Sequence, residues 1–353
     1  MVDGSTQVVP RVLEVLVHIC PYVGNRYEYC GAFTECDYIP EQSADITPHG
    51  RFIPRESLLS PVALTKVLVA GATGQQGGAV VEALRSGAYG EYEVYGMTRD
   101  AGSDAAAALT ERGVHVVEAD LNDRASLDAA VEGMDAVFLV TTFFEEGPAV
   151  ETEHGTRMVD ACVDAGVDYV VYSSVAGADR APLEHFESKH RVEEYIVDSG
   201  LEWTFVRPVY FMQNFAWQEG DIRDGTLAMP LAEGVALAVV DVADIGRMAA
   251  TAFADPDTWT GERVELAGDE LTLEAFAAVF ADALGRAVEA VHVDVDTYRA
   301  EAGDEMADMY QWFNEQGYDV DVAALSEWTE IDYATFAEYV DAHWASRPAP
   351  ASA

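Results

Sequence analysis

Short apolar runs alternate with amphipathic segments between residues 66 and 208. The runs are rich in valine and aromatic residues, and the segments between them repeat their apolar positions with the period of a helix. Strands without polar positions are typical of a parallel sheet that helices cover on both faces. We expect strands at 66–70, 92–97, 113–119, 135–141, 168–174 and 202–208, with a first helix at 76–86.

The pattern is looser after residue 210. Strands are expected at 235–242, 262–268 and 289–295, and helices near 242–254, 272–285 and 296–316. The predicted fold class is therefore α/β. It combines a doubly wound Rossmann sheet at 62–210 with a smaller C-terminal α/β substrate lobe at 211–345, which interleaves with the sheet and closes over its carboxyl edge.

Residues 1–61 differ from the rest of the chain. Prolines interrupt them repeatedly, and they show no sustained helical or strand period. We interpret them as an irregular N-terminal extension that does not belong to the native protein, with translation starting near Val62. Their cysteines do not form the close pairs of a structural zinc site, so no metal is expected at Cys20, Cys30, Cys36 and His18.

The charge of the chain indicates the solvent in which the protein works and says little about its substrate. Acidic residues outnumber basic ones 63 to 20, the net charge is −43, and only Lys66 and Lys189 are lysines. Concentrated salt screens the self-repulsion of such a chain, so the composition predicts the salt-rich cytoplasm of a halophile. The excess of acid argues against nucleic-acid binding. No apolar run reaches the length of a membrane span.

The strongest motif is "KVLVAGATGQQGGAV", in which Gly71, Gly74 and Gly77 separate an apolar strand from a helix. Glycines at this turn let a pyrophosphate approach the backbone, and the helix N-terminus supplies free N–H groups and a positive dipole end. The strand–turn–helix context indicates a dinucleotide site rather than an ordinary tight turn.

The ends of the next strands indicate which dinucleotide binds. Thr98 and Arg99 end the second strand where the ribose is expected, and an arginine there favours NADP over NAD. Asp120 ends the third strand and either contacts the adenine or caps the next helix. The fourth strand ends in "VTTFF", where Thr141 runs past the cofactor and Phe143 also suits core packing.

The segment 184–199 has a clear helical period. His185, Lys189, Val192 and Ile196 share one stripe, with the solvated charges on the opposite face. An ammonium on an inward stripe needs a partner, such as a cofactor ribose hydroxyl or a substrate oxygen, unless the lysine snorkels to the surface.

The motifs "GATGQQGG", "TRD", "VVYSSVAG", "HFESKHRVEEY" and "RPVYFMQNF" together resemble the NmrA-like branch of the atypical short-chain dehydrogenases, in particular the HSCARG type of redox sensor. The resemblance extends from about Lys66 to Trp344 and implies a Rossmann fold that binds NADP(H). The implied cofactor contacts are Gly71, Ala72, Thr73, Gly74, Gln75, Gln76, Gly77, Arg99, Asp120, Leu121, Thr141, Thr142, Phe143, Lys189, Tyr210, Phe211 and Asn214.

The chain departs from the catalytic pattern of this family. His185 stands at the tyrosine position of Tyr-x-x-x-Lys, Val175 stands where a catalytic serine is usual, and Glu153 replaces a basic residue of the sensors. Two functions remain open. One is an NADPH-dependent reductase of a quinone or small carbonyl compound, with Lys189, His185 and Tyr210 as catalytic candidates.

The other function is a non-catalytic NADP(H) sensor that changes a regulatory protein partner with redox state. Either protein is expected to be a monomer or homodimer. The aromatic segment 309–313 is interpreted mainly as core packing, although it also suits a substrate cover.

Overall fold

Neighbouring side chains of the first strand, β1 (Thr65–Val69), enter two different hydrophobic cores. The computed structural model describes residues 65–344. Val67 and Val69 pack on one face of the sheet and Leu68 on the other, all fully buried. A strand buried on both faces has no position for a polar residue, which explains its continuous apolar sequence. The predicted parallel sheet is confirmed.

The central sheet has seven parallel strands in the order β10-β6-β5-β4-β1-β2-β3. The strand order reverses between β1 and β4, and ligands of such sheets bind at the carboxyl ends of the strands beside this point. The strand expected at 262–268 joins this sheet as β10, beside β6, and not the smaller lobe. The other bounds are β2 (Tyr92–Thr98), β3 (His115–Glu118), β4 (Ala136–Val140), β5 (Tyr169–Ser173), β6 (Glu202–Pro208) and β10 (Arg263–Leu266).

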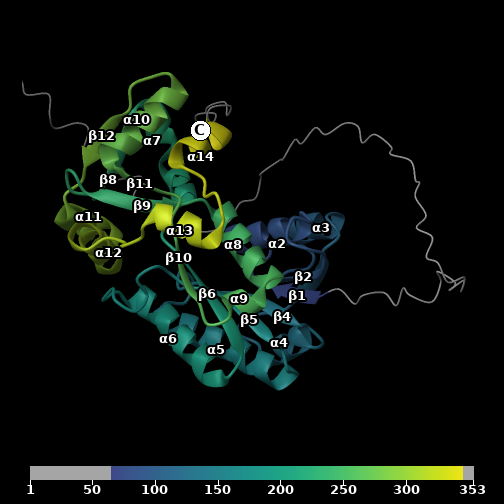
Figure 1. The fold of residues 1–353 in the computed structure, drawn as a ribbon. Helices are drawn as coiled ribbons and strands as arrows, with labels where there is room; N and C mark the ends of the chain where they lie inside the picture. Colours follow the sequence, from purple (N-terminus) through teal and green to yellow (C-terminus); the bar gives the residue numbers. More distant parts are fainter. Residues whose placement is uncertain (1–64, 345–353) are drawn as a thin grey trace, which may run out of the picture. The chain divides into compact units, whose positions relative to one another are not determined.

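Helices cover both faces of the sheet (Figure 1). On one face α2 and α8 pack against each other, and a Cβ on Gly246 would lie 2.4 Å from the carbonyl oxygen of Ala79, so their backbones approach closely. On the other face α4, α5 and α6 pack in sequence. The bounds are α2 (Gln75–Arg85), α3 (Asp104–Glu111), α4 (Arg124–Val131), α5 (Pro148–Ala165), α6 (Glu184–Ser199), α8 (Val242–Ala254) and α9 (Pro256–Trp259).

The remaining elements form a smaller α/β lobe with two short sheets, β11-β9-β7 and β12-β8. The helix expected at 296–316 is interrupted at Gly303, whose φ of +88° cannot continue a right-handed helix. The bounds are β7 (Tyr210–Phe211), η2 (Met212–Gln218), α7 (Glu219–Asp224), β8 (Thr226–Met229), β9 (Ala236–Val240), β11 (Asp269–Thr272), α10 (Leu273–Leu284), β12 (Glu289–His292), α11 (Val295–Ala302), α12 (Asp304–Glu315), α13 (Val322–Thr329) and α14 (Phe336–His343).

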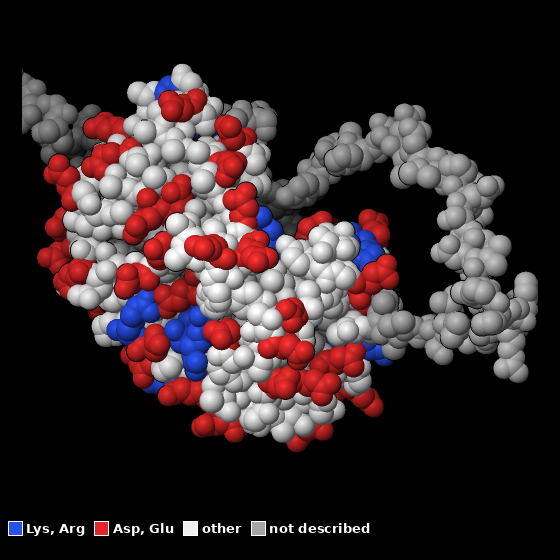
Figure 2. Space-filling model, in the orientation of Figure 1, with Lys and Arg blue, Asp and Glu red and all other residues white. Residues whose placement is uncertain are grey.

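Acidic side chains are dispersed over the visible face of the molecule and do not gather in one patch (Figure 2). Within residues 65–344, no helix combines the length and the hydropathy that crossing a bilayer would require. The N-terminal extension and its cysteines lie outside the described residues, so the interpretations of that segment stay predictions.

Candidate functional site

The glycine-rich turn between β1 and α2 has the geometry of a dinucleotide loop. Gly71 has a φ of +63°, and a Cβ on Gly77 would lie 2.3 Å from the carbonyl oxygen of Gly71, so only glycine fits there. Helix α2 begins at the N-cap Gly74 without a side-chain cap or an acidic residue in its first turn. These features leave the helix N-terminus suited to an anion. Of the other loop residues, Ala72 is buried, Thr73 and Gln75 are exposed, and Gln76 is half-buried.

Arg99 directly follows β2. This is the strand end at which we expect an arginine to contact the 2′-phosphate of NADP. The Arg99 guanidinium binds both carboxylate oxygens of Glu145, with Nη1–Oε2 at 2.6 Å and Nη2–Oε1 at 2.9 Å. Glu145 belongs to the loop after β4, so the salt bridge spans two strand ends. A carboxylate thus holds the fork of donors that a phosphate would use.

Asp120 does not cap α4, so that interpretation was wrong. The N-cap is Asp123, which accepts a hydrogen bond from the backbone N–H of Ala125, because the chain makes one more turn before the helix begins. Asp120 Oδ1 instead accepts from the N–H of Asn122 at 2.8 Å. The contact of Asp120 with adenine stays a prediction. The implied cofactor contact of Leu121 also stays a prediction, and its side chain packs against the hydrophobic core on one face of the sheet.

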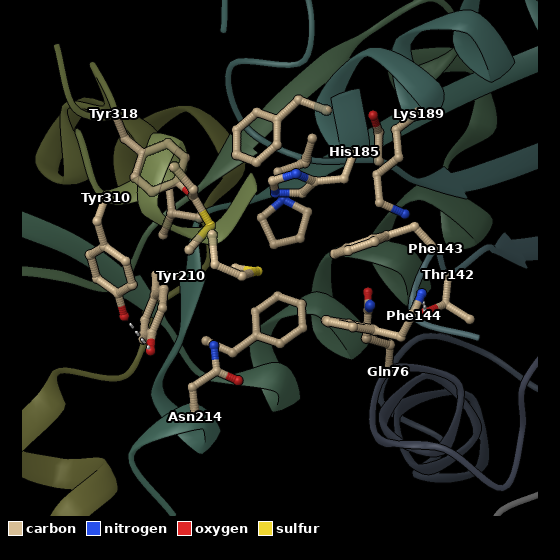
Figure 3. A pocket seen from close by; sticks show the side chains of 18 of the residues that line it. Gln76, Thr142, Phe143, Phe144, His185, Lys189, Tyr210, Asn214, Tyr310 and Tyr318 are labelled. Atoms are coloured by element: carbon tan, nitrogen blue, oxygen red, sulfur yellow. Dashed lines mark hydrogen bonds between the residues drawn. The ribbon is translucent and has the colours of Figure 1, made fainter. Parts of the chain in front are cut away.

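A cavity of about 270 Å³ lies where β4, β6 and α6 meet the smaller lobe. It brings together the predicted residues of the nicotinamide end with an aromatic wall from the lobe. Figure 3 shows tyrosines on one side, facing Lys189, Thr142 and Gln76 on the other. The predicted residues that line it are Gln76, Thr141, Thr142, Phe143, His185, Lys189, Tyr210, Phe211 and Asn214.

The ammonium of Lys189, on one side of this cavity, is hydrogen-bonded to two groups of the protein. Its Nζ donates to the carboxylate of Glu151 at 2.7 Å and to the carbonyl oxygen of Thr141 at 3.0 Å. Glu151 is 0% exposed and also accepts hydrogen bonds from the hydroxyls of Ser188 and Thr141. Burial alone would raise the pKa of Glu151, but the ammonium and these hydrogen bonds outweigh it and hold the pKa below its usual value. The prediction that Lys189 faces inward is confirmed by its exposure of only 13%.

His185 lies on the same face of α6 as Lys189 and is buried. Its ring contacts Phe143 with centroids 4.7 Å apart, and its Nδ1 is bonded to the carboxylate of Glu305 from α12. Burial lowers the pKa of His185, against the opposing effect of the Glu305 carboxylate.

Two serines follow β5 into the site with different surroundings. Ser173 Oγ donates to the side-chain oxygen of Gln76 at 2.5 Å, which links β5 to the start of α2. Ser174 lines the cavity, and its buried Oγ has no hydrogen-bond partner among residues 65–344. Val175, at the usual serine position, lines the cavity as well.

The lobe contributes most of the aromatic wall. Tyr210 and Tyr310 bring their hydroxyls within 3.4 Å of each other, and burial raises the pKa of both. The 309–313 segment serves two purposes, because Met309 and Tyr310 line the cavity while Trp312 and Phe313 enter the core. Further cavity residues are Phe144, Phe186, Trp217, Tyr298, Met306 and Tyr318.

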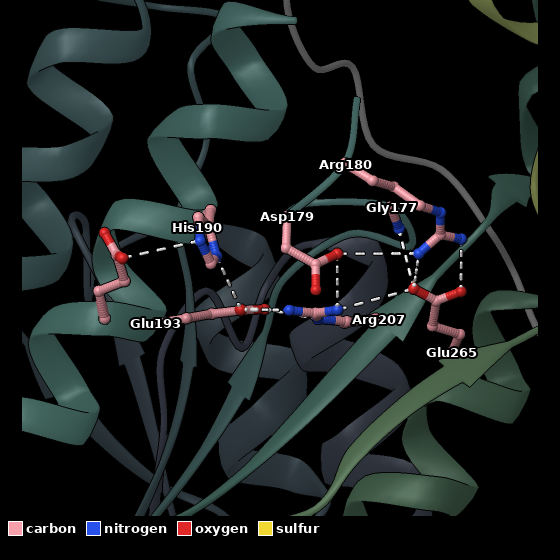
Figure 4. Close-up of polar contacts among 8 residues, drawn as sticks. Gly177, Asp179, Arg180, His190, Glu193, Arg207 and Glu265 are labelled. Carbon is pink, nitrogen blue, oxygen red and sulfur yellow. Dashed lines mark hydrogen bonds and ion pairs between the residues drawn. The ribbon is translucent and has the colours of Figure 1, made fainter. Parts of the chain in front are cut away.

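A second polar network fixes α6 on the sheet (Figure 4). Arg207 of β6 forms two hydrogen bonds with Glu193 of α6, at 2.9 and 2.6 Å, and both side chains are almost fully buried. Arg207 also contacts Asp179 and Glu265 at 3.3 and 3.6 Å. The helix that carries His185 and Lys189 is therefore held from its opposite, C-terminal half.

Three glutamates of the site were not predicted from the sequence. Glu145 and Glu305 meet partners 46 and 120 residues away, and no local pattern marks them. Glu151 had a signal, since it shares an inward stripe of α5 with Gly155, Met158 and Cys162.

The comparisons with known proteins agree with this arrangement. A family model, the NmrA-like family, matches residues 64–340. The chain belongs to the NmrA-like family. The NAD(P)H azoreductase of Xenophilus azovorans is 30% identical over 232 residues, which cover 65% of this NmrA-like protein and 78% of the azoreductase.

Two solved structures have the same fold. The NADPH-dependent quinone oxidoreductase of Escherichia coli, in complex with NADPH, has a TM-score of 0.67 and 25% identity, covering 78% of this NmrA-like protein and 99% of the oxidoreductase. NmrA, a negative transcriptional regulator, has a TM-score of 0.67 and 21% identity, covering 80% and 96%. The family therefore contains reductases, and the likeness to the regulator shows the fold alone.

Proposed function

We propose that this NmrA-like protein is an NADPH-dependent reductase whose substrate is a quinone or a small carbonyl compound. The observation that carries the proposal is the aromatic cavity beside Lys189 and His185. Aromatic side chains bind a planar ring by offset or edge contacts, and few polar groups are needed to orient it. The azoreductase and the quinone oxidoreductase are named for azo compounds and quinones, and the second name supports the quinone as the preferred class.

The residues present fit NADPH. Gly77 lets α2 pack directly against the backbone of Gly71, the uncapped N-terminus of α2 suits a pyrophosphate, and Arg99 supplies a fork suited to a 2′-phosphate. Lys189 has three donors, of which Glu151 and Thr141 take two, so the third is left for a ribose hydroxyl. When bound, the cofactor supplies a hydride.

The chain's own groups then orient the substrate and deliver a proton. Ser174 donates a hydrogen bond from its unpartnered hydroxyl to a substrate oxygen, which keeps that oxygen near His185. His185 is the proton donor and Tyr210 the second candidate. Tyr210 is the weaker acid, because burial raises its pKa and outweighs the opposing effect of the hydrogen bond with Tyr310.

NADPH oxidation in molar KCl against a panel of quinones, azo dyes and aldehydes tests the proposal. We expect turnover with quinones and a loss of kcat on Ser174→Ala, with Ser86→Ala as the control at a serine remote from the cavity. Tight binding of NADPH without turnover of any compound would contradict the reductase.

The second candidate is a redox sensor. The absence of a tyrosine at position 185 favours it. Such a protein would bind NADPH and NADP⁺ with different consequences for a regulatory partner. Its distinguishing result is a change of complex size with the redox state of the cofactor and no consumption of NADPH.

The proposal also includes the environment and the assembly. The net charge of −43 supports work in the salt-rich cytoplasm of a halophile. We propose that the protein acts as a monomer or homodimer. Sedimentation in molar KCl measures the assembly directly, and a larger oligomer would contradict this statement.

A further inference from the structure

His185 is held by a carboxylate from a part of the chain more than a hundred residues away. Glu305 is the second residue of α12, and its Oε1 accepts the backbone N–H of His185 at 3.0 Å. The same oxygen is hydrogen-bonded to Nδ1 of the His185 ring. One carboxylate therefore fixes both the backbone and the ring of the residue that replaces the family's tyrosine.

This contact determines which ring nitrogen carries the hydrogen. An ionised carboxylate only accepts, so the hydrogen of the neutral ring lies on Nδ1 and the lone pair lies on Nε2. Nε2 has no hydrogen-bond partner among residues 65–344, and the ring lines the cavity (Figure 3). Phe143 and Phe186 pack on the ring, with centroids 4.7 and 4.8 Å away, and limit its rotation.

Burial and three charged side chains shift the pKa of the His185 imidazole. Burial lowers its pKa most, and Lys189 of the same helix lowers it further. Glu305 of α12 and Glu151 of α5 raise it. Of the two glutamates, Glu305 is the one hydrogen-bonded to the ring, so its carboxylate stabilises the imidazolium more than Glu151 does.

We propose that Glu305 is the positioning residue of a His185–Glu305 pair, in which Glu305 directs Nε2 into the cavity and stabilises the imidazolium that protonates the substrate. The inference rests on the proposed reductase. A quinone becomes a hydroquinone by gaining one hydride, from NADPH, and one proton, from Nε2 of His185. The N–H bond of the imidazolium breaks, the substrate O–H bond forms, and the neutral ring regains its proton from water.

The smaller lobe is then part of the catalytic machinery and does more than cover the substrate. Glu305 also acts as an anion at the N-terminus of α6, which is a structural role on its own. The test must therefore separate positioning from capping. Two variants do so: Glu305→Gln keeps an acceptor oxygen and removes the charge, while Glu305→Ala removes both.

The first measurement does not require turnover. ¹⁵N NMR of histidine-labelled protein in molar KCl reports the tautomer and the pKa of His185, assigned with His185→Gln. We expect the Nδ1–H tautomer in the unmodified protein, a lower pKa in Glu305→Gln, and in Glu305→Ala also a mixture of tautomers. An unchanged tautomer and pKa in Glu305→Ala would overturn the pairing, whatever the fate of the reductase.

The second measurement is the pH profile of kcat with the best quinone. Activity should fall as pH rises through the pKa of His185, and in Glu305→Gln this limb should move to lower pH, with kcat about tenfold lower at neutral pH and KM little changed. Glu305→Asp should recover part of the loss. Asp304→Asn is the matched control, because Asp304 is the neighbouring, exposed acid and pairs with Arg299.

The outcomes are distinct. An altered tautomer in Glu305→Ala together with an unshifted pH profile in Glu305→Gln would overturn the catalytic role. Equal shifts in Glu305→Gln and Asp304→Asn would assign the effect to general surface charge and overturn it as well. No turnover by the unmodified protein would end the reductase proposal, while the NMR result would still decide the pairing.

Discussion

Glu145 occupies both arms of the Arg99 guanidinium, and the two residues join the loop after β4 to the carboxyl end of β2. Both side chains are about half exposed, at 44% and 56%. Exposed ion pairs of this kind contribute only about 0.2–1 kcal/mol, so a doubly charged phosphate can displace the carboxylate.

NADPH is therefore expected to bind more tightly than NADH, and Arg99→Ala to remove the preference. Loss of charge-assisted hydrogen bonds to the phosphate should weaken NADPH binding by about 10- to 100-fold and leave NADH binding unchanged. Isothermal titration in molar KCl measures both affinities. Equal affinities of the unmodified protein would refute the assignment of Arg99 to the 2′-phosphate.

Glu145→Gln should have the opposite effect, because it removes the competitor for the same guanidinium. We expect NADPH affinity to rise about two- to fivefold, in line with the small free energy of an exposed pair. Glu146→Gln is the control, since this neighbouring acid accepts from Asn122 and not from Arg99. A rise of equal size in both variants would indicate a general loss of negative charge.

Lys189→Met should leave the buried carboxylate of Glu151 without its charged partner. Removing one partner of a buried pair costs about 3–5 kcal/mol, and the double variant Lys189→Met/Glu151→Gln should recover most of this loss. Urea unfolding of the four proteins in a double-mutant cycle measures the coupling. Additive losses would show that the two side chains do not stabilise each other.

The same pair predicts a pH dependence. In the unmodified protein the pKa of Glu151 lies below its unfolded value, so the pair stabilises the fold above about pH 4, and this contribution is lost as pH falls through the folded pKa. In Lys189→Met, burial should instead raise the pKa of Glu151. The stability difference between the two proteins should then begin to shrink as pH falls through this raised pKa, above about pH 4, because the variant loses its penalty. It should shrink further below about pH 4, where the unmodified protein loses its own contribution. A constant difference from pH 3 to pH 8 would contradict this account.

We also expect Lys189 to take part in cofactor binding. Because Thr141 and Glu151 orient its ammonium, Lys189→Met should weaken NADPH binding as well as the fold. Unchanged affinity in the folded variant would place Lys189 away from the nicotinamide end.

Local patterns predicted the elements well, and they failed where distant residues meet. The continuous apolar strand, α2 and α8 follow from periodicity, and so does the inward face of Lys189. The hydrogen-bond partners on that face do not follow from periodicity. Glu305 contacts His185 only when the smaller lobe has packed against the sheet. Strand β10 was misplaced for the same reason, because its apolar pattern suits either sheet and only its pairing with β6 decides.

Gly77→Ala should destabilise the fold by about 3 kcal/mol, because its Cβ would meet the backbone of Gly71 at 2.3 Å and both segments are fixed by the sheet and the helix. The neighbouring Gly78→Ala is a matched control. There a Cβ would lie an ordinary 3.6 Å from Ala72 O, and alanine should stabilise α2 by about 0.5–1 kcal/mol. Thermal unfolding separates the two, and equal effects would contradict the close approach.

Salt should stabilise the protein by screening. The Debye length falls from about 10 Å at 0.1 M to about 3 Å at 1 M salt, so repulsion within a chain of charge −43 should weaken over that range. We expect the unfolding temperature to rise steeply between about 0.1 and about 1 M KCl and to level off above it. Sucrose is the control, since it is excluded from protein surfaces without screening charge. A rise confined to higher salt, or matched by sucrose, would indicate salting-out instead of screened repulsion.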